Sequence, residues 1–548
     1  MRTLLVWLCF GSLAIACSGP ERGAGKSASP GGRPKLVVMI VVDQLPTWAF
    51  DRDRALYTHG FARLLTGGGF VRAGDIPYAN PFTAPGHATI GTGAPPSVHG
   101  VIGNSWYRRA ETRERDAEYD ADEAAFSVGV SQGGTMSPDD GASGHALHVD
   151  GVADALRAAS PRSKSIAIGL KPRAAAFVAG RKPDLAVWYD AAAGGMTTSH
   201  AYVSDVPAWL VQLAKAKPAS RFFDVEWAPR DPAMLARVTG IADDAPGEGS
   251  VHGLGTTFPH SLAASDAPAR AFLHTPYADE VVFDTAVAAI DAMQLGTDDA
   301  PDLLAISFNA RDYAGHLWGP DSWEALDLTM RLDERLGSLF DLLDQKVGKN
   351  AWAAVLTSDH GATRVVERSP TKGARRIRSA EISEAADAAI ATKLGKGPWV
   401  ASVLSSNVYL VPAVATHPNR GPALDAAAAA VAKVSGVAIA GRVDQVTGRC
   451  RERIGLEHAL CLMVLPAESG DLYVVPVAGS LITDYKTGTH HDAPFEDNRQ
   501  VPIIVYAPGR VTPQRGEGSL LQIAPTVSAL LRIPPPSGAT ERPLFGLH

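Results

Sequence analysis

The segment LVVMIVVDQL, residues 36–45, decides the fold class of this chain. Its seven apolar residues, Leu36–Val42, leave neither face of a strand polar, which is typical of a parallel strand covered by helices on both sides. Asp43 follows at once, and open α/β sheets bind their ligands beyond the carboxyl ends of the strands. The segment therefore predicts a buried strand followed by an acidic residue at the edge of the sheet where ligands bind.

Four further apolar runs repeat this pattern and alternate with helical periodicity. The runs are Ser165–Leu170, Leu303–Phe308, Trp352–Leu356 and Val501–Tyr506. Helical patterns cover 279–294, 323–345, 422–434 and 518–531. We therefore expect an α/β fold with a doubly wound, mainly parallel sheet, and we interpret all of these runs as parallel strands.

Size and composition indicate one large catalytic domain. The chain has 548 residues, of which 46% are hydrophobic, and a formal net charge of -7. This charge gives no electrostatic case for nucleic acid as a partner. We expect the domain to cover 35–548, with insertions at about 189–276 and 364–485 that form a cap over the active face.

The first 17 residues are expected to be a signal peptide. Arg2 precedes an apolar run, Leu4–Leu13, that is too short to span a bilayer as a helix. The run ends in AIAC, which resembles a bacterial lipobox with Cys17 as the lipidated residue. Ordinary cleavage after Ala16 is the alternative. Residues 18–34 are expected to be a flexible tether, and the chain is expected in the periplasm or anchored to the outer membrane.

Two cysteines, Cys450 and Cys461, remain in the body of the chain. In an oxidising compartment such a pair indicates a disulfide that closes a short loop. A zinc site is the alternative, but no histidine or cysteine stands at zinc-finger spacing from them. We therefore predict the disulfide.

Acidic residues and histidines lie at the ends of several predicted strands. Most of them follow a strand, and His490 and His491 lie shortly before the strand Val501–Tyr506. They are Asp43 in VVMIVVDQL, Asp312 and His316 in NARDYAGHLWGP, Asp359 and His360 in TSDHGA, and His490 and His491 in GTHHDAP. Any one of these residues alone would be interpreted as a turn former or helix cap. Together, at one edge of a sheet, carboxylates and imidazoles are a ligand set suited to zinc and similar divalent ions.

Thr83 is the candidate nucleophile, in the segment ANPFTAPGHATIGTG. A threonine there is expected at the start of a helix, where the backbone amides and the helix dipole attract anions. A threonine hydroxyl needs activation to react, and a bound divalent metal can supply it. A simple helix N-cap is the alternative interpretation. His87 and His99 are expected to make structural hydrogen bonds.

The ordered set VVDQ, NPFTAPGHATIGTG, GNSWY, GLKPRAA, DYAGH, SDHG and GTHHDAP resembles the alkaline phosphatase superfamily. More narrowly, it resembles the phosphate-irrepressible alkaline phosphatases with a threonine nucleophile. The resemblance runs from about Lys35 to the C-terminus and is less clear in the two insertions. It implies an alkaline phosphatase-like fold and two zinc ions, with other divalent metals as alternatives.

The resemblance also implies a role for each matching residue. One zinc would bind Asp43, Asp359 and His360, and the other would bind Asp312, His316 and His491. Thr83 would form a covalent phosphothreonine, and Asn104, Lys171 and Arg173 would hold the phosphoryl oxygens. Asp492 stands where the family usually has glycine, and this extra carboxylate is expected either to support the ligand His491 or to tune metal affinity.

Lys171 and Arg173 favour a phosphate monoesterase, because a monoester offers more charged oxygens to fixed cations than a diester does. The diesterase branch of the superfamily lacks this K-x-R feature. A phosphodiesterase or nucleotide pyrophosphatase is nevertheless the first alternative. The second is a surface lipoprotein that binds phosphate-bearing ligands without catalysis.

Overall fold

The computed structural model describes residues 32–127, 134–135, 141–192, 194–404 and 406–548. The predicted signal peptide, Cys17 and nearly all of the predicted tether lie outside these residues. Among the described residues, no helix combines the length and apolar character needed to cross a membrane.

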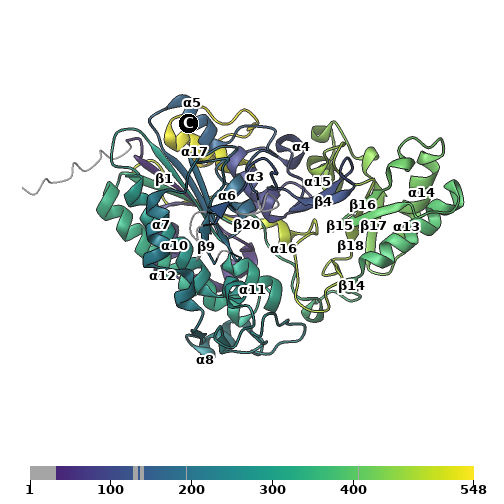
Figure 1. Ribbon diagram of the computed structural model, residues 1–548, viewed down its shortest axis with the longest axis horizontal. Coiled ribbons are helices and arrows are strands. Elements are labelled where there is room, and N and C mark those ends of the chain that lie inside the picture. Colours follow the sequence, from purple (N-terminus) through teal and green to yellow (C-terminus); the bar gives the residue numbers. More distant parts are fainter. Residues whose placement is uncertain (1–31, 128–133, 136–140, 193, 405) are drawn as a thin grey trace, which may run out of the picture.

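A nine-stranded sheet forms the centre of the structure, in the order β21-β2-β20-β13-β1-β12-β7-β8-β9 (Figure 1). Its two edge strands are β21 (Gln514–Gly516) and β9 (Gly195–Thr197). The first strand, β1 (Leu36–Val42), is fully buried and lies parallel between β12 (Asp302–Phe308) and β13 (Trp352–Thr357). The parallel part continues through β7 (Ser165–Gly169) and β8 (Leu185–Asp190). The apolar run at the start of the chain therefore forms a central strand, as predicted.

The strand β20 (Gln500–Tyr506) corrects one expectation. It runs antiparallel to both β13 and β2 (Gly69–Asp75), so the interpretation of Val501–Tyr506 as a parallel strand was wrong. Burial on both faces does not determine strand direction. The chain enters β20 at the edge of the sheet where residues 359–362 also lie. There the backbone N–H of Gly361 donates to the carbonyl of Asn498.

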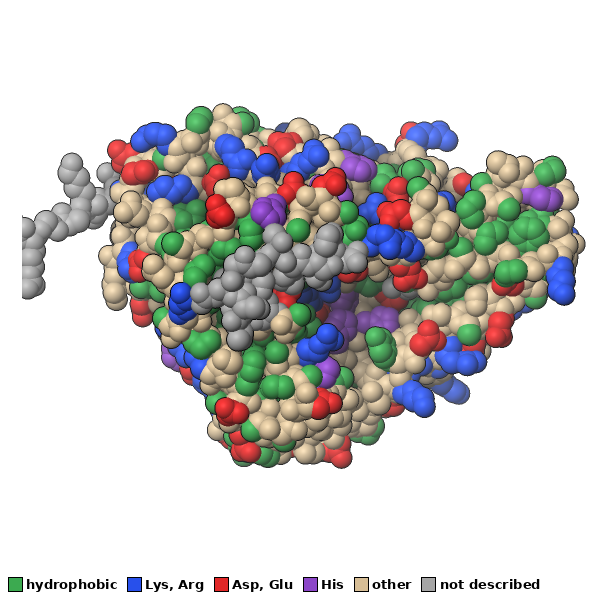
Figure 2. Space-filling view, viewed as in Figure 1, with side chains coloured by type: hydrophobic (Ala, Val, Ile, Leu, Met, Phe, Trp, Pro, Cys, Tyr) green, Lys and Arg blue, Asp and Glu red, His purple; other side chains and the backbone are tan. Residues whose placement is uncertain are grey.

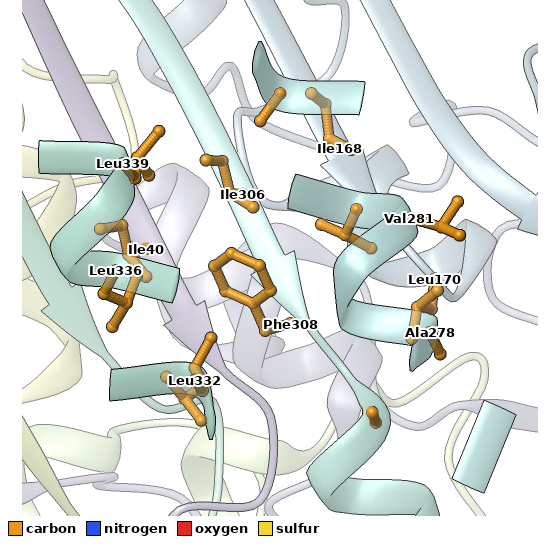
Figure 3. Packing of buried hydrophobic residues seen from close by; sticks show 14 of the residues in the cluster. Ile40, Ile168, Leu170, Ala278, Val281, Ile306, Phe308, Leu332, Leu336 and Leu339 are labelled. Atoms are coloured by element: carbon orange, nitrogen blue, oxygen red, sulfur yellow. The ribbon is translucent and has the colours of Figure 1, made fainter. Parts of the chain in front are cut away.

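Helices cover both faces of the sheet. On one face, α10 (Pro276–Ala292) and α12 (Trp323–Leu343) pack against alternate residues of the strands. Figure 3 shows Ile306 and Phe308 of β12 beside Leu336 and Leu339 of α12. The opposite residues of β1 pack with α3 (Thr83–Thr92) and α17 (Ile523–Leu531). The predicted doubly wound α/β fold is thus confirmed, with its helices displaced by a few residues.

A separate lobe lies beside this body (Figure 1). Its four-stranded sheet has the order β15-β16-β18-β17, from β15 (Val400–Leu404), β16 (Asn407–Leu410), β17 (Val437–Arg442) and β18 (Leu472–Pro476). Two helices, α13 (Ser379–Leu394) and α14 (Arg420–Val431), share a hydrophobic core with it. The described residues of the other predicted insertion, 189–276, form short helices and strands, among them α7 (Ala208–Ala216) and α8 (Pro232–Thr239).

The predicted disulfide is present. Cys450 and Cys461 are bonded, with their Cα atoms 5.4 Å apart and a sequence separation of 11. Cys461 belongs to α15 (Gly455–Met463), whose Ala459 carbonyl accepts a hydrogen bond from the backbone N–H of Ala79. The disulfide therefore closes a short loop on a helix that contacts the segment before Thr83.

We predict that replacing both cysteines by serine lowers the free energy of unfolding of this region by about 3 kcal/mol, because the unfolded chain regains the entropy of the open loop. Chemical denaturation with and without reductant measures it. Reductant should destabilise the original protein and leave the double variant unchanged, and an equal response of both would contradict the prediction.

Candidate metal centre and nucleophile

The predicted ligands meet at the carboxyl edge of the parallel strands. Asp43 follows β1, and Asp359 and His360 follow β13. Asp312 and His316 lie on α11 (Ala310–Trp318), the helix that follows β12. In Figure 2, histidine side chains are visible in the hollow between the main body and the lobe of β15–β18.

Two compact groups of metal-ligand atoms result. Asp312, His316 and His491 form one, and Asp43, Asp312 and His360 form the other, with all ligand atoms of a group within 4.8 Å of one another. Asp312 is common to both groups. The sequence-based assignment gave Asp359 to the second group. Its Oδ2 lies 3.2 Å from Nε2 of His360, but the third member of the compact group is Asp312.

The three histidines are oriented by backbone carbonyls. In each, Nδ1 lies within hydrogen-bond distance of a carbonyl oxygen, which orients the ring so that Nε2 faces the site. The partners of His316, His360 and His491 are the carbonyls of Thr489 at 2.7 Å, Gly361 at 2.9 Å and Pro81 at 2.8 Å. This arrangement is typical of metal-binding histidines.

The carboxylates fit a divalent cation as well. Oδ1 of Asp43 and Oδ2 of Asp359 are buried and accept no hydrogen bond within the described part of the chain. Each lies 3.2 Å from Nε2 of His360. Two buried carboxylates and an imidazole that converge on one point are a donor set suited to a divalent cation, so the residues present fit the metal centre that the sequence indicates.

The electrostatics of the site agree with this assignment. Burial and the neighbouring Asp312 raise the pKa of Asp43, but Lys171 and His360 lower it by more. The net pKa is below the ordinary value, so Asp43 is ionised. Burial and the other two histidines hold the pKa of His491 well below its usual range, which keeps its imidazole neutral. Burial lowers the pKa of His360, but Asp359 and Asp43 raise it to about 9, so a bound metal would displace this proton.

Thr83 lies between these groups and is 1% exposed. It is the first residue of α3, whose N-cap is Phe82, so the N-cap interpretation of Thr83 does not hold. Its Oγ1 lies 3.3 Å from Nε2 of His360 and accepts a hydrogen bond of 3.3 Å from Nζ of Lys171. Gly86 brings the helix close, because a Cβ there would lie 2.5 Å from the carbonyl oxygen of Asp359.

The ammonium of Lys171 contacts two predicted metal ligands as well as Thr83. It stands before α6 (Pro172–Phe177), and its Nζ donates to Oδ2 of Asp43 at 2.8 Å and to Oδ2 of Asp312. Burial lowers its pKa, but the two aspartates raise it above the ordinary lysine value. The ammonium therefore remains charged beside Thr83.

Asn104 contacts the start of α3, and Arg173 lies beside the buried carboxyl of Glu118. Nη1 of Arg173 lies 3.7 Å from Oε1 of Glu118, a carboxyl whose pKa burial raises to about 7 although Arg173 lowers it. Oδ1 of Asn104 accepts the backbone N–H of Ala84 at 2.8 Å, which leaves its Nδ2 hydrogens as donors. Asn104 and Lys171 thus contact Thr83 or the residue after it, while the contact that the structure gives Arg173 is with Glu118.

The outer contacts include residues that the sequence did not single out. Asn309 donates from Nδ2 to Oδ2 of Asp43 at 2.6 Å, and its only sequence signal is its place directly after a strand. His87 makes the structural hydrogen bonds expected of it, with Nε2 2.7 Å from Oγ of Ser307 and Nδ1 2.8 Å from the carbonyl of Thr83.

His490 belongs to neither compact group, in agreement with the choice of His491. Its Nδ1 lies 3.4 Å from Oδ1 of Asp492, a fully buried carboxylate whose oxygens accept no hydrogen bond from the described residues.

Comparison with known proteins places this site in a family. The sequence model of the type I phosphodiesterase / nucleotide pyrophosphatase family matches residues 37–498. Alkaline phosphatase PafA of Elizabethkingia meningoseptica is 29% identical over 534 residues, with 93% of this chain and 94% of the relative covered. Alkaline phosphatase PhoV of Synechococcus elongatus is 30% identical over 545 residues, with 94% and 93% covered.

A solved structure agrees with these relatives. The crystal structure of wild-type PafA superposes with a TM-score of 0.86 at 28% sequence identity and covers 94% of this chain and 99% of its own. The shared fold and the match over most of the length confirm the resemblance drawn from the motifs. The chain belongs to the type I phosphodiesterase / nucleotide pyrophosphatase family, within the alkaline phosphatase superfamily.

Proposed function

We propose that this protein is a phosphate monoester hydrolase of the alkaline phosphatase type, with Thr83 as its nucleophile and two zinc ions. Asp43, Asp359 and His360 would hold one ion, and Asp312, His316 and His491 the other. The observation that carries the proposal is the position of Thr83, whose Oγ1 lies 3.3 Å from both Nε2 of His360 and Nζ of Lys171. The relatives named alkaline phosphatases support it.

The residues of the chain divide the reaction between them. Oγ1 of Thr83 forms a bond to phosphorus as the bond to the leaving oxygen breaks, which gives a phosphothreonine and the free alcohol. Water then cleaves the phosphothreonine and releases inorganic phosphate. Bound zinc ions would lower the pKa of the Thr83 hydroxyl and neutralise charge on the leaving oxygen. Asn104 and Arg173 would hold the remaining phosphoryl oxygens in the transition state.

Preference for monoesters follows from charge. Lys171 and Arg173 bring two permanent positive charges to one side of Thr83, where a monoester presents a doubly charged phosphoryl group. A diester presents one charge fewer and gains less from them. Phosphodiester hydrolysis is the second candidate function, because the matching family model carries that description.

Export from the cytoplasm is part of the proposal. It rests on the N-terminal segment that ends in Cys17 and on the Cys450–Cys461 disulfide, since disulfides persist in oxidising compartments. A lipid on Cys17 would attach the enzyme to a membrane, and metabolic labelling with a tagged fatty acid in the original chain and in Cys17→Ser tests this attachment.

We predict that Thr83→Ala lowers kcat/KM for an aryl phosphate monoester by about 10³-fold or more, because no oxygen remains to form the covalent intermediate. Thr83→Ser keeps the hydroxyl and serves as the matched control. Trapping with a labelled monoester at low pH should yield phosphoprotein from the original chain and from the serine variant only. Monoesterase activity in Thr83→Ala close to that of the original protein would sink the assignment.

We predict that Arg173→Ala lowers monoester turnover by about 10²-fold and diester turnover much less, because the lost guanidinium contacts the oxygen that only the monoester leaves charged. Arg173 is the cleaner target, since Lys171 also contacts Asp43 and Asp312. Matched aryl mono- and diesters measure the ratio. An equal loss on both substrates would contradict the phosphate-binding role.

We predict that removing metal with a chelator abolishes monoester hydrolysis and that added zinc restores it, because the buried carboxylates and imidazoles would hold the ions that activate Thr83 and the leaving group. Elemental analysis after reloading should give two zinc ions per chain. The variant His360→Ala should recover far less activity under the same conditions. Turnover that survives complete metal removal would exclude the proposed mechanism.

A further inference from the structure

Gln44, the residue after Asp43, adopts an unusual backbone conformation. Its φ is 61°, in the left-handed region, and the residue is completely buried. Residues other than glycine adopt this conformation where the surrounding structure holds them in it, and such residues concentrate at functional sites. The interactions of Gln44 therefore need a functional explanation.

Gln44 contacts ligand residues from two other elements. Its side-chain Nε2 donates to Oδ1 of Asp312 at 2.8 Å, and its backbone N–H lies 3.3 Å from Oδ1 of Asp359. Its carbonyl oxygen accepts from Nη1 of Arg311, a fully buried guanidinium. Through these contacts one residue connects the ends of β1 and β13 with α11.

The hydrogen bond to Asp312 determines which way that carboxylate faces. Oδ1 of Asp312 lies 3.2 Å from Nε2 of His316 and 3.7 Å from Nε2 of His491, the other two members of its group. Oδ2 accepts from Lys171 instead. Because Gln44 donates to Oδ1, it fixes the rotation of the carboxylate with Oδ1 toward the two histidines.

Gly315 provides the space for this side chain. A Cβ at position 315 would lie 1.8 Å from Oε1, 2.8 Å from Cδ and 3.4 Å from Nε2 of Gln44, and these are the three nearest atoms. Gly315 lies inside α11, directly before His316, where glycine weakens a helix. The steric demand of Gln44 accounts for a glycine at this position.

We propose that Gln44 is a positioning residue for the Asp312–His316–His491 metal site and that Gly315 is required because Gln44 occupies the space beside it. The glutamine of VVDQ and the glycine of DYAGH then form one coupled pair across 271 residues of chain. This inference rests on the proposed metal centre and adds to it a residue pair that touches no substrate.

The test is a double-variant cycle read by zinc affinity in the full-length protein. Gln44→Gly deletes the side chain and keeps both the left-handed backbone and the N–H toward Asp359. Gly315→Ala introduces the Cβ. In the original background we expect Gly315→Ala to weaken zinc binding at one site by about 10- to 100-fold, as measured by chelator competition. In the Gln44→Gly background, the same change should cost less than about 3-fold, because the atoms that it would meet are gone.

A third variant separates hydrogen bonding from shape. Gln44→Met keeps the length of the side chain but lacks the donor, so it should lower zinc affinity while thermal stability stays close to that of the original. An equal cost of Gly315→Ala in both backgrounds, or unchanged zinc affinity in Gln44→Met, would overturn the proposal.

Zinc affinity and monoester turnover are measured in separate assays. An original protein that binds zinc but leaves monoesters intact would refute the proposed phosphatase activity, and the variant cycle would still decide the role of Gln44.

Discussion

Repulsion between buried carboxylates is the constraint on which the rest of this structure depends. Asp43, Asp312 and Asp359 are each at most 1% exposed, and oxygens of Asp43 and Asp312 lie within 4.8 Å of each other. Two like charges about 4 Å apart repel by about 4 kcal/mol at an effective dielectric constant of about 20. A fold that places these side chains together must provide positive charge and hydrogen-bond donors around them.

The surrounding residues provide both. Lys171 donates to the facing Oδ2 atoms of Asp43 and Asp312, while Asn309 and Gln44 donate neutral N–H groups to these same two carboxylates. The histidines turn Nε2 inward because backbone carbonyls lie within hydrogen-bond distance of their Nδ1 atoms. In the described part of the chain, Oδ1 of Asp43 and Oδ2 of Asp359 keep capacity for a divalent cation. The same arrangement leaves Thr83 beside an imidazole and an ammonium, where its hydroxyl can be activated.

Close packing of α3 and α11 against the sheet edge makes this geometry possible. Gly86 lets α3 approach the backbone of Asp359, and Gly315 lets α11 accept the side chain of Gln44. In both cases a methyl group on the glycine would collide with the residue packed against the helix. The positions of the two helices therefore depend on glycine at 86 and 315. The reason for each glycine is the residue packed against it, Asp359 or Gln44.

The sequence alone determined the fold class and nearly all of the candidate site. Apolar runs such as Leu36–Val42 can be buried only between helical layers, and residues that follow strands converge at one edge, so Asp43, Asp312, His316 and His360 could be named from position and chemistry. The direction of β20 could not be predicted from the sequence, because apolar residues pack equally well in a parallel or an antiparallel strand. The grouping of ligands, with Asp312 in both groups and Asp359 beside them, depends on side-chain rotation. The roles of Asn309, Gln44 and Gly315 were decided by the tertiary structure alone, because hydrogen bonds and steric contacts between residues hundreds of positions apart leave no local pattern in the chain.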